Sequence, residues 1–282
     1  MSGPEARPGE EGFAGTATAH FRDLQTRLCA TFESFEPQSR FEARSWTKPQ
    51  GHRLQGGGES RLMRGDVFEK VGVNVSHVWG VLPVEARGQV AGAEASAGRF
   101  VACGISLVAH MTNPYVPAVH MNLRYLSTSR AWFGGGSDLT PTFPIHEDTE
   151  AFHAALRRAC EAYRPGAYQE YKEWCDRYFY LPHRQEPRGV GGIFFDDLAS
   201  GNASADFAFV RAVGDAVLEV FPQIVARRKD TPYDGPAREA LLVKRGRYVE
   251  FNLVYDRGTR FGFSTDADPE AYLMSLPPLV RW

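Results

Sequence analysis

Apolar residues recur three and four positions apart in four stretches of the chain, which is the spacing of an amphipathic helix. These stretches are residues 13–38, 147–163, 167–181 and 204–227. In the first of them, Phe21, Leu24, Leu28 and Phe32 would lie on one side of the helix. We therefore expect one helix near the start of the chain and three in its second half.

Apolar and polar residues alternate in three other stretches, which is the pattern of strands with two different faces. These stretches are residues 67–80, 100–110 and 119–126. Residues 191–195 form a short apolar run that fits a further strand. Residues 40–66 are polar and glycine-rich, so we expect a flexible connection there.

The C-terminal part is expected to hold a short helix and a hairpin. The helix covers about residues 236–245, because Pro236 is favoured in the first turn of a helix. Residues 248–255 alternate, meet a turn at 256–258 and continue into a strand at 259–264. Strands first, helices in the middle and a closing hairpin predict an α+β fold with a large, mainly antiparallel β-sheet.

The composition is that of a globular protein, with 43% hydrophobic and 23% charged residues. Aromatic residues make up 12%, which suits a sizeable core or a flat apolar ligand site. The net charge of −2 gives no field that would attract nucleic acid or a membrane surface. No apolar stretch approaches the roughly 18 residues of a transmembrane helix. We expect a disordered tail at 1–12 and a single catalytic domain at 13–282.

Residues 1–12 are acidic and have no apolar core, unlike a secretory signal or an organelle transit peptide. The chain has four cysteines without CxxC spacing. We therefore expect free thiols, mostly buried as small hydrophobic residues, and a cytoplasmic location.

The alternation places polar residues on one face of two neighbouring strands. His110 and Ser106 share a face of the first strand, and His120, Asn122 and Arg124 share a face of the second. If the strands form a hairpin with His110 opposite His120, then Asn122 lies opposite Val108 and Arg124 opposite Ser106. From alternation alone, a solvated sheet face explains this pattern at least as well as a site.

Several long motifs follow one another in the order of a known family. The motifs are RGDVFEKVGVNVS at 64–76, NPYVPAVHMNLRY at 113–125, WFGGGSDLTP at 132–141, YKEWCD at 171–176, RGVGGIFFDDL at 188–198 and YVEFNLVYDRGT at 248–259. The chain resembles the oxygen-dependent coproporphyrinogen III oxidases from about residue 16 to Trp282. The resemblance implies a large antiparallel sheet with helices on both faces and a homodimer.

The resemblance also implies the reaction. Two propionates of coproporphyrinogen III become vinyls, and O2 is the co-substrate. No glycine-rich dinucleotide motif follows a strand, and no cysteine cluster could hold iron–sulfur, so we expect no organic cofactor. Gly134, Gly135 and Gly136 are expected to allow a sharp turn or a close approach of the backbone to a ligand.

Matching positions in the family imply the site residues. His120 corresponds to the proposed proton donor, and Asp138 to a carboxylate that holds the pyrrole N–H groups and abstracts a proton. Arg124 suits a propionate, because a guanidinium pairs bidentately with a carboxylate. Ser106 and residues 122–124, including Asn122 and Leu123, correspond to substrate-binding positions. Without the family, a turn cap before Thr140-Pro141 explains Asp138 equally well.

A metal site is a weaker expectation. Family members are sometimes described as binding a divalent cation through four histidines, and the matching residues are His110, His120, His153 and His183. Their spacing carries no metal motif, so hydrogen-bonding or interface roles are the more common explanation.

The chain departs from the family near its C-terminus. Many members have a Gly-Gly-Arg-like triplet where this chain has Asp266-Ala267-Asp268, so an acidic residue replaces a basic one. We therefore assign no substrate contact to 266–268. Three other functions stay open: a tetrapyrrole carrier without catalysis, a divalent-metal hydrolase on the histidine-rich face, and a purely structural dimer module.

Overall fold

The computed structural model describes residues 10–264 and 268–282. Within this part of the chain, seven strands form one antiparallel sheet in the order β1-β2-β3-β4-β5-β6-β9. They are β1 (Glu42–Thr47), β2 (Leu54–Met63), β3 (Phe68–Val81), β4 (Arg99–Met111), β5 (Ala118–Ser127), β6 (Ala131–Thr140) and β9 (Gly191–Leu198). A small hairpin joins β7 (Tyr180–Leu181) and β8 (Glu186–Pro187).

Among the residues described, one helix comes before the strands, three lie between strands, and the others follow β9. They are α1 (Glu10–Glu33), α2 (Val84–Arg87), α3 (His146–Tyr163), α4 (Ala167–Tyr178), α5 (Ala203–Arg228), α6 (Gly235–Val254), α7 (Arg257–Ser264) and α8 (Pro269–Tyr272), followed by the 3-10 turn η1 (Leu273–Ser275). The first nine residues of the predicted tail lie outside the described residues, and α1 begins at Glu10.

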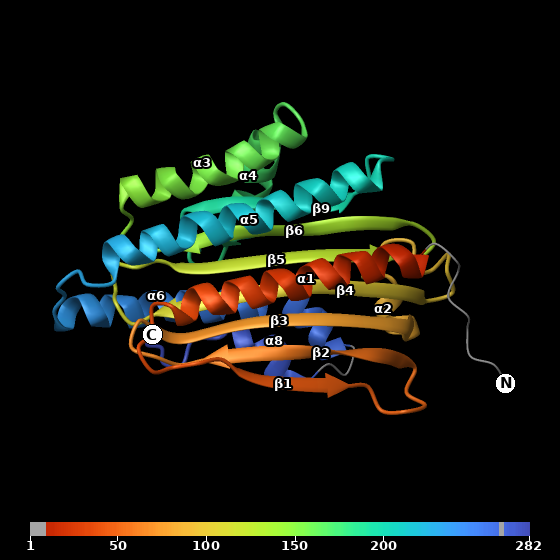
Figure 1. The fold of residues 1–282 in the computed structure, drawn as a ribbon, viewed down its shortest axis with the longest axis horizontal. Helices are drawn as coiled ribbons and strands as arrows, with labels where there is room; N and C mark the ends of the chain where they lie inside the picture. Colours follow the sequence, from red (N-terminus) through yellow and green to blue (C-terminus); the bar gives the residue numbers. More distant parts are fainter. Residues whose placement is uncertain (1–9, 265–267) are drawn as a thin grey trace.

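The sheet separates two layers of helices (Figure 1). On one face, α1 packs against β3 to β5 and α5 packs against β5 and β6, and together they bury the main core. The odd-numbered residues of the strands supply the sheet side of this core, for example Val73, Leu107 and Met121. On the other face lie α6, α8 and η1. The predicted α+β fold with helices on both faces is confirmed.

The prediction of a flexible connection at 40–66 is wrong, because this region forms β1 and β2. Gly56 and Gly58 lack side chains where two tryptophan rings lie against the strand. A Cβ atom on Gly58 would lie 2.7 Å from the ring of Trp46, and one on Gly56 would lie 2.7 Å from the ring of Trp79. The aromatic rings therefore cover a glycine-rich strand that has little side-chain signal of its own.

The predicted C-terminal hairpin is also wrong. Residues 248–254 continue α6, and residues 257–264 form α7. In α6 the buried residues Leu241, Arg245, Tyr248 and Asn252 are spaced four, three and four apart, which is a helical spacing. The alternation between Tyr248 and Tyr255 arises within that longer helical pattern.

Candidate functional site

The polar faces of β4 and β5 come together as an antiparallel pair. Val108 lies opposite His120, Ser106 opposite Asn122, and Gly104 opposite Arg124. The predicted face is therefore confirmed, but the predicted register is wrong by two residues. A shift of two keeps every side chain on its face, so alternation alone could not detect it.

The loop between β4 and β5 helps to set this register. The Asn113 side chain donates hydrogen bonds to the carbonyl oxygens of Lys229 (3.0 Å) and Thr231 (2.8 Å), and it accepts one from the backbone N–H of Tyr115 (3.0 Å). These bonds hold the loop against the end of α5, so a distant segment helps to choose the pairing.

Strand β6 adds an acidic residue to the same face. Asp138 lies opposite His120, and Gly134 lies opposite Arg124. The glycine triplet is part of a strand, so the expectation of a sharp turn is wrong. A Cβ atom on Gly134 would lie 2.8 Å from Nε of Arg124 and 2.6 Å from Oδ1 of Asp196. Gly134 therefore leaves space for two charged side chains above it.

Asp138 is fully buried and is held by two partners. Nη2 of Arg188 donates to both carboxylate oxygens at 2.8 Å, and Nδ1 of His120 lies 2.9 Å from Oδ1. Burial alone would raise the pKa of Asp138, but the Arg188 guanidinium and His120 outweigh burial and hold the pKa below its usual value. The carboxylate is therefore ionised, and both of its oxygens accept hydrogen bonds.

Arg188 is buried to the same extent, with 1% of its side chain exposed. Its guanidinium carbon lies 4.0, 4.6 and 4.7 Å from the ring centroids of Phe179, Tyr248 and Phe251. These rings exclude water and add cation–π attraction, so the ion pair sits in an aromatic cage. We did not single out Arg188 from the sequence. The available signal was the family motif RGVGGIFFDDL, which begins with Arg188.

His120 connects this buried pair to the outside. Because Asp138 accepts at Nδ1, the ring proton of neutral His120 lies on Nδ1 and Nε2 carries the lone pair. The side chain is 22% exposed, and in the described part of the chain Nε2 has no hydrogen-bond partner. The ring of His120 packs edge-to-face with the ring of Phe179, with 5.8 Å between the centroids. Nε2 is thus placed to exchange a proton with a ligand on the polar face.

Arg124 lies on the same face and is about one-third exposed. Its Nη2 lies 2.9 Å from Oδ1 of Asp196, and Nη1 donates to Oδ1 of Asn122 at 3.3 Å. Ser106 is half-buried beside Asn122. Leu123 points to the opposite face and is buried in the core, so any ligand contact at this position would come from its backbone.

The four histidines of the expected metal set make separate contacts. His110 Nε2 lies 2.8 Å from the Ser275 carbonyl, His153 contacts Tyr168 and the Val190 carbonyl, and His183 contacts Glu250 and Tyr255. Among the residues described, no three His, Cys, Asp or Glu side chains gather so that they could hold a metal ion. The four histidines therefore do not fit one metal, and neither does the arrangement fit the hydrolase alternative.

The first motif, on β3, fastens the C-terminal segment to the polar face. Glu69 pairs with Arg238 and Arg245 of α6, at 2.8 and 2.9 Å. Lys70 donates to the carbonyl oxygen of Leu276, and Asn74 donates to that of Ala271, both at 2.7 Å. These contacts hold α6, α8 and η1 over the strands that carry the site.

Asp268 is the one residue of the triplet 266–268, where the chain differs from its family, that lies within the described residues. Residues 266 and 267 lie outside the described residues. Oδ2 of Asp268 lies 2.8 Å from Nη2 of Arg44 on β1, and its Oδ1 accepts from the backbone N–H of Glu270 at the start of α8. The acidic residue at 268 therefore has a local structural partner.

All four cysteines are buried free thiols. Burial raises the pKa of Cys29 and of Cys160 to about 12, so these thiols are neutral and unreactive. In the described part of the chain, no helix is both long enough and apolar enough to cross a membrane.

Comparison with known proteins agrees with the resemblance seen in the motifs. The family described as coproporphyrinogen III oxidase matches residues 16–282. The oxygen-dependent coproporphyrinogen-III oxidase of Rickettsia akari (strain Hartford) is 51% identical over 271 residues, which cover 93% of this chain and 95% of the relative. Proteins of the same name from Rickettsia bellii (strain OSU 85-389) and Rickettsia africae (strain ESF-5) are 50% identical over the same lengths. With almost the whole chain matched at this identity, the chain belongs to the coproporphyrinogen III oxidase family.

Proposed function

We propose that this chain oxidatively decarboxylates two propionates of coproporphyrinogen III and forms protoporphyrinogen IX. Each propionate loses CO2 and two hydrogens and becomes a vinyl group. The two electrons and two protons released at each step reduce one O2 to H2O2. The observation that carries the proposal is that Arg124 and the His120–Asp138 pair lie on one sheet face of a member of this family.

The electrons come from the substrate itself. The reduced macrocycle has electron-rich pyrrole rings, and dioxygen accepts electrons from them directly. The residues described here therefore need to bind carboxylates, orient the ring and move protons. We propose that the reaction needs no organic cofactor.

Arg124 is proposed to bind a propionate of the substrate. Its guanidinium matches a carboxylate bidentately and is partly accessible. Asp196 shares Nη2 of Arg124, so a propionate would compete with Asp196 for this guanidinium. Gly134 leaves room for the Arg124 side chain beside the strand.

His120 is proposed to transfer the proton, through Nε2. We expected Asp138 to accept the pyrrole N–H groups directly, but its oxygens are occupied by Arg188 and His120. We propose that Asp138 instead fixes the tautomer of His120 and stabilises its protonated form, so that Nε2 alternates between base and acid. Ser106 and Asn122 would line the bound ring beside Arg124.

The decisive experiment is incubation of the purified chain with coproporphyrinogen III without oxygen, followed by admission of O2 and chromatography of the oxidised products. We expect protoporphyrin only after O2 is added. Product formed without O2, or no product with O2, would refute the proposed function.

Variants assign the roles. His120→Asn and Asp138→Asn should each lower kcat about 100-fold or more, since general acid–base catalysis contributes that much. Arg124→Met should mainly raise KM. Arg177→Met, which changes an exposed arginine on α4, is the matched control and should keep normal activity. Near-normal kcat in His120→Asn would remove His120 from the mechanism.

We also propose that the chain is a homodimer, as the family resemblance implies. Its small net charge favours action without nucleic acid, and its N-terminal residues and cysteines favour a cytoplasmic location. Sedimentation equilibrium of the purified chain tests the oligomeric state. A single species at the mass of one 31.4 kDa chain would contradict the homodimer.

A further inference from the structure

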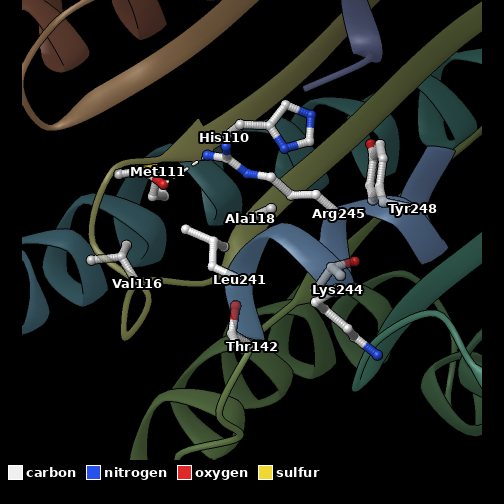
Figure 2. A pocket seen from close by; sticks show the side chains of 10 residues that line it. His110, Met111, Val116, Ala118, Thr142, Leu241, Lys244, Arg245 and Tyr248 are labelled. Carbon is white, nitrogen blue, oxygen red and sulfur yellow. Dashed lines mark hydrogen bonds between the residues drawn. The ribbon is translucent and has the colours of Figure 1, made fainter. Parts of the chain in front are cut away.

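A small pocket lies between the ends of β4 and β6 and the side of α6 (Figure 2). Its walls include His110, Thr140, Arg245 and Tyr248. Tyr248 lines this pocket and also belongs to the aromatic cage around Arg188, so the pocket adjoins the proposed site.

Three buried polar atoms without a hydrogen-bond partner belong to residues that line this pocket. They are Nδ1 of His110, Oγ1 of Thr140 and Nε of Arg245. The residues are 1%, 7% and 3% exposed, so bulk water does not satisfy these atoms. Buried polar atoms almost always have a partner, and leaving one unpaired is costly. Three such atoms on residues of one pocket wall therefore point to a hydrogen-bonding ligand in this pocket.

The hydrogen-bonding character of each atom can be assigned. His110 Nε2 faces the carbonyl oxygen of Ser275 at 2.8 Å, and a carbonyl only accepts, so Nε2 carries the proton. Burial lowers the pKa of His110 to about 3, so the ring is neutral near pH 7. Nδ1 is therefore an acceptor. Nε of Arg245 is a donor, and the Thr140 hydroxyl can do either.

This combination selects the class of ligand. A metal cation cannot accept a hydrogen bond from Arg245, and a carboxylate has no hydrogen to donate to His110. A neutral molecule with an O–H group can do both. We infer that the pocket between β4, β6 and α6 binds one buried water molecule, which donates to His110, accepts from Arg245 and contacts Thr140.

Such a water would connect three segments that are distant in the sequence. Thr140 ends β6 two residues after Asp138, His110 is bonded to the C-terminal segment, and Arg245 lies on α6. The water would thus fasten the covering helices to the strand that carries Asp138. This inference does not depend on the proposed reaction.

The substitution Thr140→Val tests the inference, because valine has nearly the shape of threonine but lacks its hydroxyl group. The two possible states of the pocket predict different changes in the urea midpoint. If water is bound, the variant loses a hydrogen bond, and its urea midpoint should fall. If the pocket is dry, the variant loses only an unsatisfied hydroxyl, and its midpoint should stay or rise. Thr142→Val, at a half-buried position in the same pocket wall, is the control and should change the midpoint less.

A crystal structure at high resolution gives a second measurement that does not depend on the variant. We expect one water peak within hydrogen-bonding distance of His110 Nδ1 and Arg245 Nε. An empty pocket, a pocket that takes up xenon under pressure, or density for an anion or metal would overturn the inference, as would an unchanged or raised urea midpoint in Thr140→Val.

Discussion

Arg188 sets the charge balance around Asp138. Each of the two side chains is 1% exposed, and Arg188 donates to both carboxylate oxygens. A buried charge is tolerated only when it is paired and hydrogen-bonded. The pair is therefore expected to matter for folding as well as for the orientation of His120.

We predict that Arg188→Met destabilises the chain by about 3–5 kcal/mol, because Asp138 remains as an unpaired buried charge. Urea unfolding of the purified variant measures the change. The double variant Arg188→Met with Asp138→Leu removes both charges and should regain much of the loss. A single variant as stable as the parent would mean that water or another group already compensates Asp138.

His110 makes the fold sensitive to acid. Its pKa is lowered to about 3 in the folded chain by burial, whereas an exposed histidine titrates near 6.5. Between these values only the unfolded chain binds the proton, so stability is complete above pH 6.5 and falls as the pH drops towards 3. The slope for one proton is about 1.4 kcal/mol per pH unit.

Urea midpoints measured between pH 7 and pH 4 test this prediction for His110. The variant His110→Asn should show a shallower loss of stability with acid, smaller by about one bound proton. An acid profile of the same slope in both proteins would show that His110 does not contribute.

At the level of the elements, α1 and the turn before β3 are joined by one carboxylate. Glu36 follows α1 and is buried, and it accepts hydrogen bonds from the backbone N–H groups of Asp66, Val67 and Phe68 at 2.8–2.9 Å. Gly65 lies against the same carboxylate, where a Cβ atom would approach within 2.3 Å. The RGDVF part of the first motif therefore forms a turn around Glu36.

We predict that Glu36→Gln destabilises the chain by about 1–3 kcal/mol, because the amide group turns a donor towards backbone donors and leaves at least one unpaired. Thermal or urea unfolding measures the loss. Glu42→Gln, at an exposed position on β1, is the control and should change stability little. Equal stability of the two variants would contradict the role of Glu36.

Across the whole chain, the C-terminal segment covers the part of the polar sheet face that β3 and the end of β4 form. Lys70, Asn74 and His110 each bond to a backbone carbonyl of residues 271–276. Met274 packs over Gly72, where a Cβ atom would lie 2.1 Å from its Sδ. Met274 can therefore lie in this position only because Gly72 has no side chain.

We predict that Gly72→Ala loosens the C-terminal segment and lowers stability by about 1–3 kcal/mol, as expected for an overpacked contact. Chymotrypsin should cleave after Tyr272 faster in this variant. Gly88→Ala, where nothing lies within 4 Å of the new Cβ, should be cleaved at the parental rate. Unchanged cleavage in Gly72→Ala would show that Met274 moves aside without cost.

Local spacing in the sequence was enough for part of the fold. The helices α1, α3, α4 and α5, the strands β3 to β5, and the polar face with Ser106, Asn122 and Arg124 follow from periods of 3.6 and 2, and β9 follows from a short apolar run. The motifs were enough to identify the family. Each of these features depends on residues close together in the chain, where the period is visible.

Only the tertiary structure decided the register of β4 with β5, the helical state of residues 248–264 and the pairing of Arg188 with Asp138. Asp138 and Arg188 are 50 residues apart, and no residue near either of them in the sequence predicts that they pair. A local period specifies which way a side chain points. Which distant group it meets is decided by how the layers pack, since charges are buried only where a partner is already in place.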